Sequence, residues 1–233
     1  MLNRTGPSCE DDYECLAERD ALLISGKAGD VRLHLALLIS LAVVFVWSVI
    51  RPHDLFTWIL EAMPAIVGVL VLLLTYKRFR LTNLAYVLIW IHCIILLIGA
   101  HYTYALMPAF NQLKDAFDLS RNYYDRVGHV AQGFIPAILV REVLLRTSPL
   151  KKGKWLFFIV VCICLAISAS YELLEWSVAA VTGTAADMFL GTQGDVWDTQ
   201  KDMVLCFLAA IVALVTLGPM HDRSLDKIGV ETE

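Results

Sequence analysis

Six long apolar runs constrain the fold of this chain more than any other feature. They lie at 33–50, 55–76, 83–101, 126–146, 155–176 and 202–218. A helix of about 20 such residues spans the roughly 30 Å hydrocarbon core of a bilayer. Each run predicts a helix, because none alternates with the period of two typical of barrel strands and lipid offers no partner to unpaired backbone groups. With 58% hydrophobic and 18% charged residues among 233, the composition excludes a soluble domain and predicts an all-α bundle of about six transmembrane helices.

Polar segments flank this apolar core. Residues 1–32 are acid-rich and lack the basic start and apolar stretch of a cleaved signal peptide. We therefore expect a polar cytoplasmic N-terminal extension at 1–32, a six-helix transmembrane domain at 33–218 and a cytoplasmic C-terminal tail at 219–233. The connection 177–198 has no Lys or Arg and is half apolar. It is either a re-entrant or interfacial segment between the last two spans or an ordinary exposed loop.

Basic residues indicate which way the chain crosses the membrane, because Lys and Arg in short loops resist translocation. The loops 77–80 and 151–154 carry three basic residues each, and most of the 19 Lys and Arg lie on the same side as these loops and the two termini. This predicts that both termini are cytoplasmic. The ends of the third and fifth spans, and the starts of the fourth and sixth, are then expected on the outer side.

Acids and histidines gather at this predicted outer level on four spans. Such groups at the edge of a bilayer are costly and are functional candidates by default. Nothing comparable is expected at the inner ends, where the polar residues are mostly solitary Lys and Arg. The outer candidates are His101 at the end of the third span, Asp125, Arg126 and His129 at the start of the fourth, Glu172 and Glu175 at the end of the fifth, and Asp195, Asp198 and Asp202 at the start of the sixth.

Helical spacing puts several of these residues on shared faces. Asp125 and His129 are four apart, as are Asp198 and Asp202, and two glutamates are three apart in YELLEW. Paired acids repel each other unless a cation, a shared proton or Arg126 lies between them. Carboxylates with a histidine can hold Zn²⁺, Mn²⁺ or iron, and carboxylates alone suit Ca²⁺ or Mg²⁺. A divalent metal ion is therefore the expected cofactor.

The predicted site has two overlapping sets of residues. The expected catalytic groups are Glu172 or Glu175 as general base, His129, and Arg126 as a clamp for an oxyanion or phosphate. The expected metal ligands are His101, Asp125, His129, Glu172, Glu175, Asp195, Asp198 and Asp202.

Simpler alternatives stay open for some of these residues. Asp195 and Asp125 suit the N-caps of the sixth and fourth spans as well as they suit a site. Capping does not explain His129, Glu172 or Glu175, because a Glu at a helix C-terminus opposes the dipole. Glu61 and His92 lie inside spans, where each is either a proton relay to the outer site or one half of a hydrogen-bonded interhelical pair.

The longest polar motifs are HYTY at 101–104, YDRVGHVAQG at 124–133, YELLEW at 171–176 and FLGTQGDVWDTQKDM at 189–203. Together they resemble the YjdF-like family of bacterial inner-membrane proteins, a domain of unknown function. The likeness covers most of the chain and implies a small multispanning protein of the bacterial inner (cytoplasmic) membrane, without an established activity. The His, acidic pair and spaced Asp residues are similar, more distantly, to VanZ-like membrane proteins. Glu175 departs from that pattern, so no VanZ role is transferred.

Three functions follow from these observations. The first is a metal-dependent hydrolase or transferase acting on a lipid or lipid-linked substrate at the outer surface. The second is a cation- or proton-coupled transporter, which lacks polar residues in the inner halves of the last two spans. The third is a structural or assembly protein whose acids only join helices. Membrane lipids are the expected partners, and no nucleic acid is expected.

Overall fold

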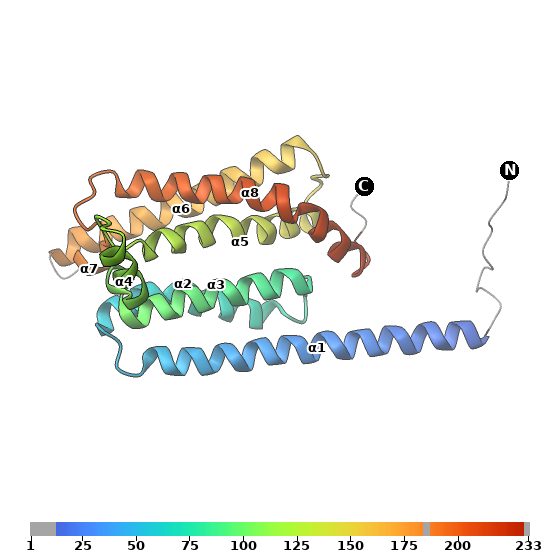
Figure 1. The fold of residues 1–233 in the computed structure, drawn as a ribbon. Helices are drawn as coiled ribbons and strands as arrows, with labels where there is room; N and C mark the ends of the chain where they lie inside the picture. Colours follow the sequence, from blue (N-terminus) through green and yellow to red (C-terminus); the bar gives the residue numbers. More distant parts are fainter. Residues whose placement is uncertain (1–12, 184–186, 231–233) are drawn as a thin grey trace. The chain divides into compact units, whose positions relative to one another are not determined.

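The structure, a computed structural model, describes residues 13–183 and 187–230 (Figure 1). Among these residues none lies in a strand, which confirms the predicted all-α class. The elements in chain order are α1 (Tyr13–Val49), α2 (Leu55–Thr75), α3 (Asn83–Tyr102), the 3-10 turn η1 (Tyr104–Leu106), α4 (Pro108–Ala116), α5 (Tyr124–Thr147), α6 (Lys154–Thr182), α7 (Asp187–Leu190) and α8 (Asp198–Asp226).

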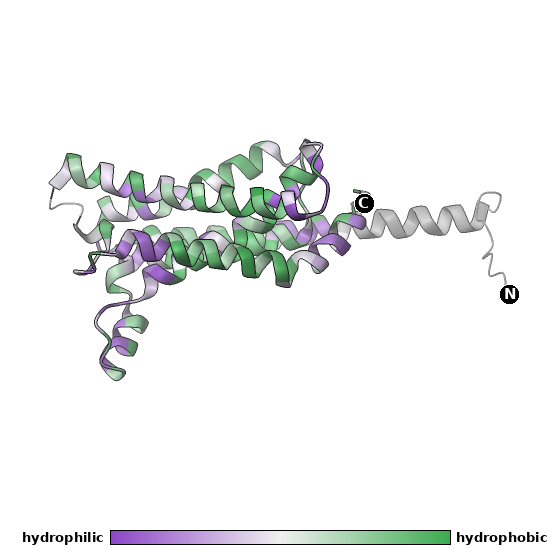
Figure 2. Cartoon of the chain, turned by 90° about the horizontal axis from the view of Figure 1, so that it is seen from above, coloured by the Kyte–Doolittle hydropathy of each residue, from purple (hydrophilic) through white to green (hydrophobic). Residues whose placement is uncertain are grey.

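Six helices of the described segments are long and apolar enough to cross a membrane, as predicted. These candidate spans are Gly29–Val49, Leu55–Thr75, Asn83–Tyr102, Tyr124–Thr147, Lys154–Thr182 and Asp198–Asp226. Figure 2 shows hydrophobic residues along the middle of the helices and hydrophilic ones nearer their ends and connections. Three helices are clearly longer than predicted: α1 already begins at Tyr13, and α6 and α8 continue past their predicted ends. No helix-breaking residue follows 176 before Gly183, whose φ is 61°, and α8 continues through Pro219. The division at residues 32 and 218 stays a prediction.

The chain divides into two units, Met1–Ser40 and Leu41–Glu233. The described part of the first unit is the beginning of α1. In the second unit, one apolar cluster joins the end of α1 to α2 and α3, and another joins α3 to α5. A third cluster packs α5, α6 and α8 through small residues such as Ala137, Ala210 and Ala213. Small side chains let helix backbones approach closely in lipid.

Glycine brings α5 and α8 closest together. A Cβ at Gly133 would lie only 2.0 Å from the carbonyl oxygen of Cys206 on α8, a separation that no side chain tolerates. Gly133 is one turn beyond His129 on α5, and Cys206 is one turn beyond Asp202 on α8. The close contact therefore holds the charged starts of these two helices against each other.

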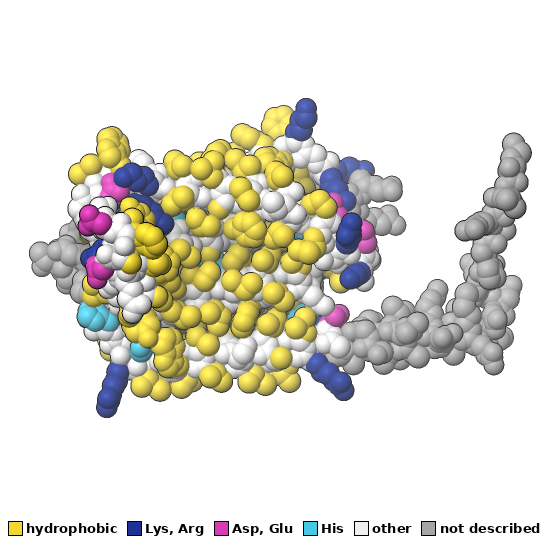
Figure 3. Space-filling view, viewed as in Figure 1, with side chains coloured by type: hydrophobic (Ala, Val, Ile, Leu, Met, Phe, Trp, Pro, Cys, Tyr) yellow, Lys and Arg dark blue, Asp and Glu magenta, His cyan; other side chains and the backbone are white. Residues whose placement is uncertain are grey.

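The second unit has two polar ends. We call the end that holds the connections 50–54, 103–123 and 183–197 the site end, and the end that holds 76–82 and 148–153 the opposite end. On the face drawn in Figure 3, hydrophobic side chains cover the middle of the helices, and Lys, Arg, Asp and Glu gather towards the ends. At the site end Asp54 caps α2, because its carboxylate accepts the Thr57 backbone N–H at 2.7 Å. That bond lowers the pKa of Asp54.

Candidate metal-binding site

His129 on α5 faces buried carboxylates from three helices. Its Nε2 lies 3.5 Å from Asp125 Oδ1 on α5, 3.6 Å from Glu172 Oε1 on α6 and 3.8 Å from Asp202 Oδ1 on α8. All four residues are buried. A charge-assisted hydrogen bond from nitrogen to a carboxylate measures about 2.7–2.9 Å. The three oxygens therefore surround the nitrogen at distances too long for hydrogen bonds.

The other ring nitrogen of His129 fixes the tautomer. Nδ1 lies 3.1 Å from the side-chain oxygen of Gln132, one turn along α5. An amide oxygen only accepts hydrogen bonds, so this contact assigns the proton of the neutral ring to Nδ1 and leaves the lone pair on Nε2. A lone pair and three carboxylate oxygens repel one another. The arrangement therefore calls for a positive charge at its centre, either a metal ion or a second proton on the imidazole.

Two of the three surrounding oxygens lack any partner. Glu172 Oε1 and Asp202 Oδ1 are shielded from solvent and accept no hydrogen bond within the described part of the chain. Leaving a buried acceptor unpaired costs about 1–3 kcal/mol, and more when it is charged. Asp125, His129 and Asp202 offer ligand atoms that all lie within 4.8 Å of one another. The group thus combines buried carboxylate oxygens that accept no hydrogen bond from the described residues with a spacing that suits metal ligands.

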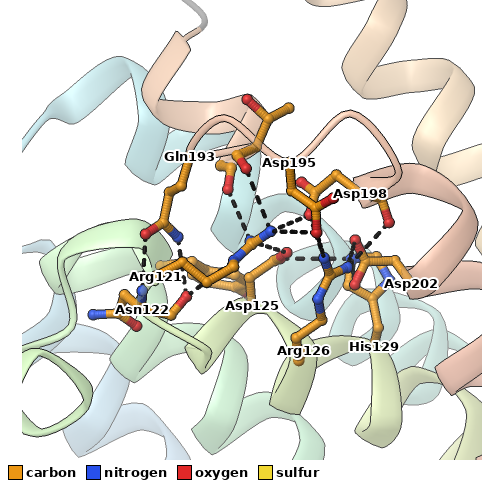
Figure 4. Close-up of polar contacts among 12 residues, drawn as sticks. Arg121, Asn122, Asp125, Arg126, His129, Gln193, Asp195, Asp198 and Asp202 are labelled. Atoms are coloured by element: carbon orange, nitrogen blue, oxygen red, sulfur yellow. Dashed lines mark hydrogen bonds and ion pairs between the residues drawn. The ribbon is translucent and has the colours of Figure 1, made fainter. Parts of the chain in front are cut away.

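Arg126 joins the start of α5 to the start of α8. Its guanidinium forms ion pairs with Asp198 Oδ1 and Asp202 Oδ2, donates to the Asp198 carbonyl at 3.0 Å and lies 3.3 Å from Asp195 Oδ2 (Figure 4). Arg126 thus lies between the aspartates, one of the three arrangements that the sequence left open. Only one oxygen of Asp202 is engaged in this way, and the other points to His129.

The sequence did not predict any role for Arg121. This residue precedes α5, is only 4% exposed, pairs with Asp198 and donates to the Gly191 carbonyl at 2.9 Å. Its neighbour Asn122 donates its backbone N–H to the Gln193 side chain at 2.9 Å, and that side chain donates back to the Asn122 carbonyl at 3.0 Å. The connection before α5 is therefore locked to the connection before α8. The one hint in the sequence was the four-residue spacing from Arg121 to Asp125, which form an ion pair at 3.6 Å.

The capping alternatives for Asp195 and Asp125 are wrong. Tyr123 is the N-cap of α5 and Trp197 that of α8, and neither cap makes a side-chain hydrogen bond. Asp195 instead binds Lys201, whose amino group lies 2.9 and 2.6 Å from its two oxygens, and accepts the Trp197 backbone N–H at 3.1 Å. The hydrogen bond from Lys201 is the main cause of a lowered pKa for Asp195. Asp195 thus belongs to the rim of the site, and Asp125 faces His129.

Two other predicted ligands are not among the three carboxylates that surround His129 Nε2. His101 on α3 places its Nδ1 3.0 Å from the Ser48 carbonyl oxygen and its ring 4.2 Å from that of Trp47. It therefore ties α3 to the end of α1. Glu175 is buried on α6, one turn from Glu172, and forms no hydrogen bond or ion pair with another residue of the described segments.

The two acid–base candidates inside spans have different surroundings. Glu61 on α2 is 2% exposed, and its Oε1 accepts the Tyr104 backbone N–H at 3.2 Å, while its Oε2 accepts no hydrogen bond from the described residues. His92 on α3 lines a groove that also contains Asp125 and His129.

The expectation that the opposite end holds nothing comparable is wrong. Glu142 on α5 is fully buried there, and its two oxygens accept the Thr82 backbone N–H at 2.9 Å, the Thr82 hydroxyl at 2.7 Å, Arg146 at 2.7 Å and His221 at 3.1 Å. This contact was not predicted from the sequence, because His221 follows the last apolar run and lies in the predicted C-terminal tail. The continuation of α8 past residue 218 brings that histidine back against α5.

Arg141 fixes the tautomer of His221, as Gln132 does for His129. Arg141 donates to His221 Nδ1 at 2.8 Å, so the proton of the neutral ring is on Nε2, which donates to Glu142. Arg141 also pairs with Asp222 at 2.5 Å. Each side chain in this chain of contacts has a partner, in contrast to the unpartnered oxygens at the site end. The opposite end is therefore a satisfied structural network.

Comparison with known proteins adds the family. Residues 33–223 match the model described as "Predicted membrane protein (DUF2238)". This chain belongs to that family. It is 44% identical over 194 residues to the inner membrane protein YjdF of Escherichia coli (strain K12), which covers 83% of this chain and 93% of that protein. The resemblance to the YjdF-like family is thereby confirmed. No solved structure matches the chain.

Membership in the family and the six apolar helices identify a multi-pass membrane protein, and the relative's name places that relative in the inner membrane. The cytoplasmic location of both termini stays a prediction.

Proposed function

We propose that this DUF2238 protein is a metal-dependent hydrolase or transferase that acts on a lipid or lipid-linked substrate at the membrane surface. The ion would be held by His129, Asp125 and Asp202, whose ligand atoms lie within 4.8 Å of one another, and a fourth position beside Glu172 would stay open for water. One observation carries the proposal: Nε2 of His129 faces three carboxylate oxygens, of which two accept no hydrogen bond from the described residues. A nitrogen together with carboxylate oxygens suits Zn²⁺, Mn²⁺ or Fe²⁺ better than Ca²⁺ or Mg²⁺, which favour oxygen alone.

The distances from His129 to its candidate co-ligands are compatible with a tetrahedral ion. Ligands about 2.0–2.2 Å from a tetrahedral Zn²⁺ are about 3.3–3.6 Å apart. The separations of 3.5 and 3.8 Å from His129 Nε2 to Asp125 and Asp202 are close to that range. Octahedral ligands about 2.1 Å from Mg²⁺ would lie only about 3.0 Å apart. Zn²⁺ is therefore the first ion to test.

The surrounding residues have supporting roles in this proposal. Gln132 orients the imidazole through Nδ1, and Arg126 holds the second oxygen of Asp202, as partners behind metal ligands commonly do. Arg126 thereby becomes a positioning residue. Its guanidinium is engaged with Asp195, Asp198 and Asp202, which leaves no free pair of N–H groups for the substrate clamp that the sequence predicted.

The chemistry needs one base beyond the ligands. A bound ion makes hydroxide available from water near neutral pH and polarises an acyl or phosphoryl oxygen. Glu175 is buried one turn from Glu172 and has no bonded partner among the described residues, so it is the candidate base. The water oxygen would bond to the acyl carbon or phosphorus and the ester bond would break. Glu175 would carry the water proton to the leaving oxygen.

The alternatives have less support. A transporter needs a polar path through the bundle, yet the core between α5, α6 and α8 consists of apolar residues and cysteines such as Val160, Cys164 and Cys206. A purely structural role accounts for Arg121 and Arg126. It does not account for the unpartnered oxygens of Glu172 and Asp202.

Metal analysis of the purified protein tests the proposal. After treatment with EDTA and exposure to Zn²⁺ or Mn²⁺, we expect about one tightly bound ion per chain and a raised melting temperature, since an ion at 100 times its Kd adds about 2.7 kcal/mol of stability. Asp202→Asn is expected to abolish binding, and Gln132→Ala to weaken it by about 10- to 100-fold.

The matched control is Asp195→Asn, which removes an acid of the rim and should leave the affinity for the ion within a few-fold of the parent. A folded protein that binds neither ion, and whose melting temperature ignores both ions and EDTA, would rule out the proposal. In that case a doubly protonated imidazole supplies the positive charge at His129.

A further inference from the structure

A groove of about 550 Å³ leads from the candidate site into the membrane-spanning part of the second unit. Its walls come from α2, α3, α5 and α6, and are mostly apolar, with Leu96, Pro136, Ile163, Ile167 and Leu174 among them. Ile167 is 39% exposed, so the groove opens sideways between the helices. In a membrane that opening faces lipid.

The length of the groove corresponds to one leaflet. On α5 it runs from Asp125 to Pro136, and on the antiparallel α6 from Leu174 to Ile163. Eleven steps of 1.5 Å give about 16 Å along either helix, which is about half of the 30 Å hydrocarbon core. The groove therefore reaches from the site end to about the middle of the bilayer.

The volume of the groove indicates the size of the ligand that it can hold. A water molecule occupies about 30 Å³ in the liquid, so about 550 Å³ holds roughly 18 groups of that size. A methylene group is comparable in size to water. The volume of the groove thus corresponds to about one acyl chain of 16 to 18 carbons.

An unused hydroxyl lies at the site end of the groove. Tyr104 is buried with its ring against Gly99 on α3 and Gly128 on α5, where added Cβ atoms would lie 2.2 and 3.4 Å from it. Tyr104 lines the groove, and its hydroxyl is shielded from solvent without a hydrogen-bond partner among the described residues. Burial raises the pKa of Tyr104, which keeps the hydroxyl protonated as a donor.

We propose that this groove binds one acyl chain of a phospholipid from the leaflet at the site end, and that Tyr104, Gln132 and His129 contact the polar group of that lipid. Tyr104 and His129 line the part of the groove nearer the site end, Gln132 lies one turn further along α5, and the remaining walls are mostly apolar. This inference rests on the proposed function, because it names the substrate class of the same site. The chain would enter sideways from the bilayer, and the ester linkage would then lie beside the candidate metal ligands.

Photolabelling in vesicles tests the inference. The probe is phosphatidylglycerol with a diazirine near the end of one acyl chain, in vesicles of phosphatidylethanolamine and phosphatidylglycerol that contain the full chain. Mass spectrometry is expected to find the label on groove residues of α3, α5 and α6 well above lipid-exposed positions elsewhere. Ala166→Trp narrows the groove and should reduce groove labelling about tenfold, the loss expected when about two methylenes are no longer buried.

Leu96→Trp adds bulk to the opposite wall of the groove and should also reduce groove labelling. It replaces Ala166→Trp if that variant fails to fold. The matched control, Val212→Trp, adds the same bulk on the exposed surface of α8 and should leave groove labelling unchanged. Equal labelling of the groove and of exposed positions, or equal labelling in Ala166→Trp and Val212→Trp, would overturn the inference. So would competition by a polyprenyl phosphate when unlabelled phosphatidylglycerol does not compete.

The same probe separates this inference from the proposed function. In EDTA-treated protein and in Asp202→Asn, groove labelling is expected to persist although the ion is lost, because the apolar walls do not depend on Asp202. Ion binding without selective groove labelling would refute the acyl-chain site and support the metal proposal. Selective groove labelling without ion binding would refute the metal proposal and support the acyl-chain site.

Discussion

Substitution of Gly133 by alanine probes the contact on which the candidate site depends. The added Cβ would lie 2.0 Å from the Cys206 carbonyl oxygen and 2.7 Å from its carbonyl carbon, both backbone atoms that cannot rotate away. Contacts between a Cβ and a backbone atom normally begin at about 3 Å, so α5 and α8 must separate by about 1 Å. Overpacking costs about 1–3 kcal/mol, and an unyielding backbone favours the upper value. Alanine regains about 1 kcal/mol of helix propensity. The expected net loss is about 2 kcal/mol.

The separation should also weaken the site. The hydrogen bond from Arg126 to the Asp198 carbonyl would lengthen from 3.0 Å to about 4 Å, beyond hydrogen-bond range. Asp202 would move away from His129 by a similar amount, so the affinity for Zn²⁺ should fall together with stability.

Unfolding in mixed detergent micelles, followed by circular dichroism, measures the effect. The control is Gly68→Ala on α2, where an added Cβ meets nothing within 4 Å, so its stability should be equal or higher by up to about 1 kcal/mol. If Gly133→Ala proves as stable as Gly68→Ala and binds the ion equally well, the close approach of α5 and α8 is refuted.

Three further substitutions have definite expected outcomes. Tyr104→Phe should stabilise the lipid-free protein by about 1 kcal/mol, measured by thermal melting in detergent, because it removes a buried hydroxyl without a partner. Glu142→Ala should lower the free energy of unfolding by about 3–5 kcal/mol in a denaturant titration, because the buried groups that bond to its carboxylate lose their acceptor. Lys201→Ala should raise the pKa of Asp195 towards the ordinary aspartate range, as infrared titration of labelled aspartate would record, because the amino group is the main cause of the lowering.

Two of these predictions have a defined outcome that would contradict them. Tyr124→Phe loses a 2.8 Å bond to the Ile95 carbonyl and should cost about 0.5–1.5 kcal/mol, so equal losses in both tyrosine variants would contradict the unpartnered hydroxyl of Tyr104. For Asp195 the folded pKa lies below the unfolded value. Its contribution is therefore complete above the unfolded pKa and is lost as pH falls through the folded one. An unchanged Asp195 titration in Lys201→Ala would show that the lysine does not bind it.

Much of the candidate site could be predicted from the sequence because helix geometry is local. Asp125 and His129 share a face through their four-residue spacing, and the topology of alternating spans brings Asp202 and Glu172 to the same end. What the sequence lacked was the pairing of helices. The close approach at Gly133 decides that α8, with its aspartates, packs on α5, and no periodicity within one helix contains that information.

The errors have the same origin. Arg121 lies in a connection, and its partners come from another connection 70 residues later. Glu142 stands among arginines at the end of its run, and its partner His221 lies beyond the last apolar run. His101 has the right depth for the site, but its ring is turned towards α1. Depth could be estimated from the sequence, whereas side-chain direction around each helix axis could not.

The pairing of Arg126 with the aspartates of α8 has a consequence for biogenesis. Its partners Asp198 and Asp202 are made about 70 residues after it, when α5 and α6 already occupy the membrane. An unpaired arginine near the membrane edge is unfavourable until then. A nascent chain that ends before α8 therefore carries an unneutralised charge and an exposed helix face. Such truncated products would be prime substrates for membrane proteases, and arrival of α8 is the step that commits the protein to its mature form.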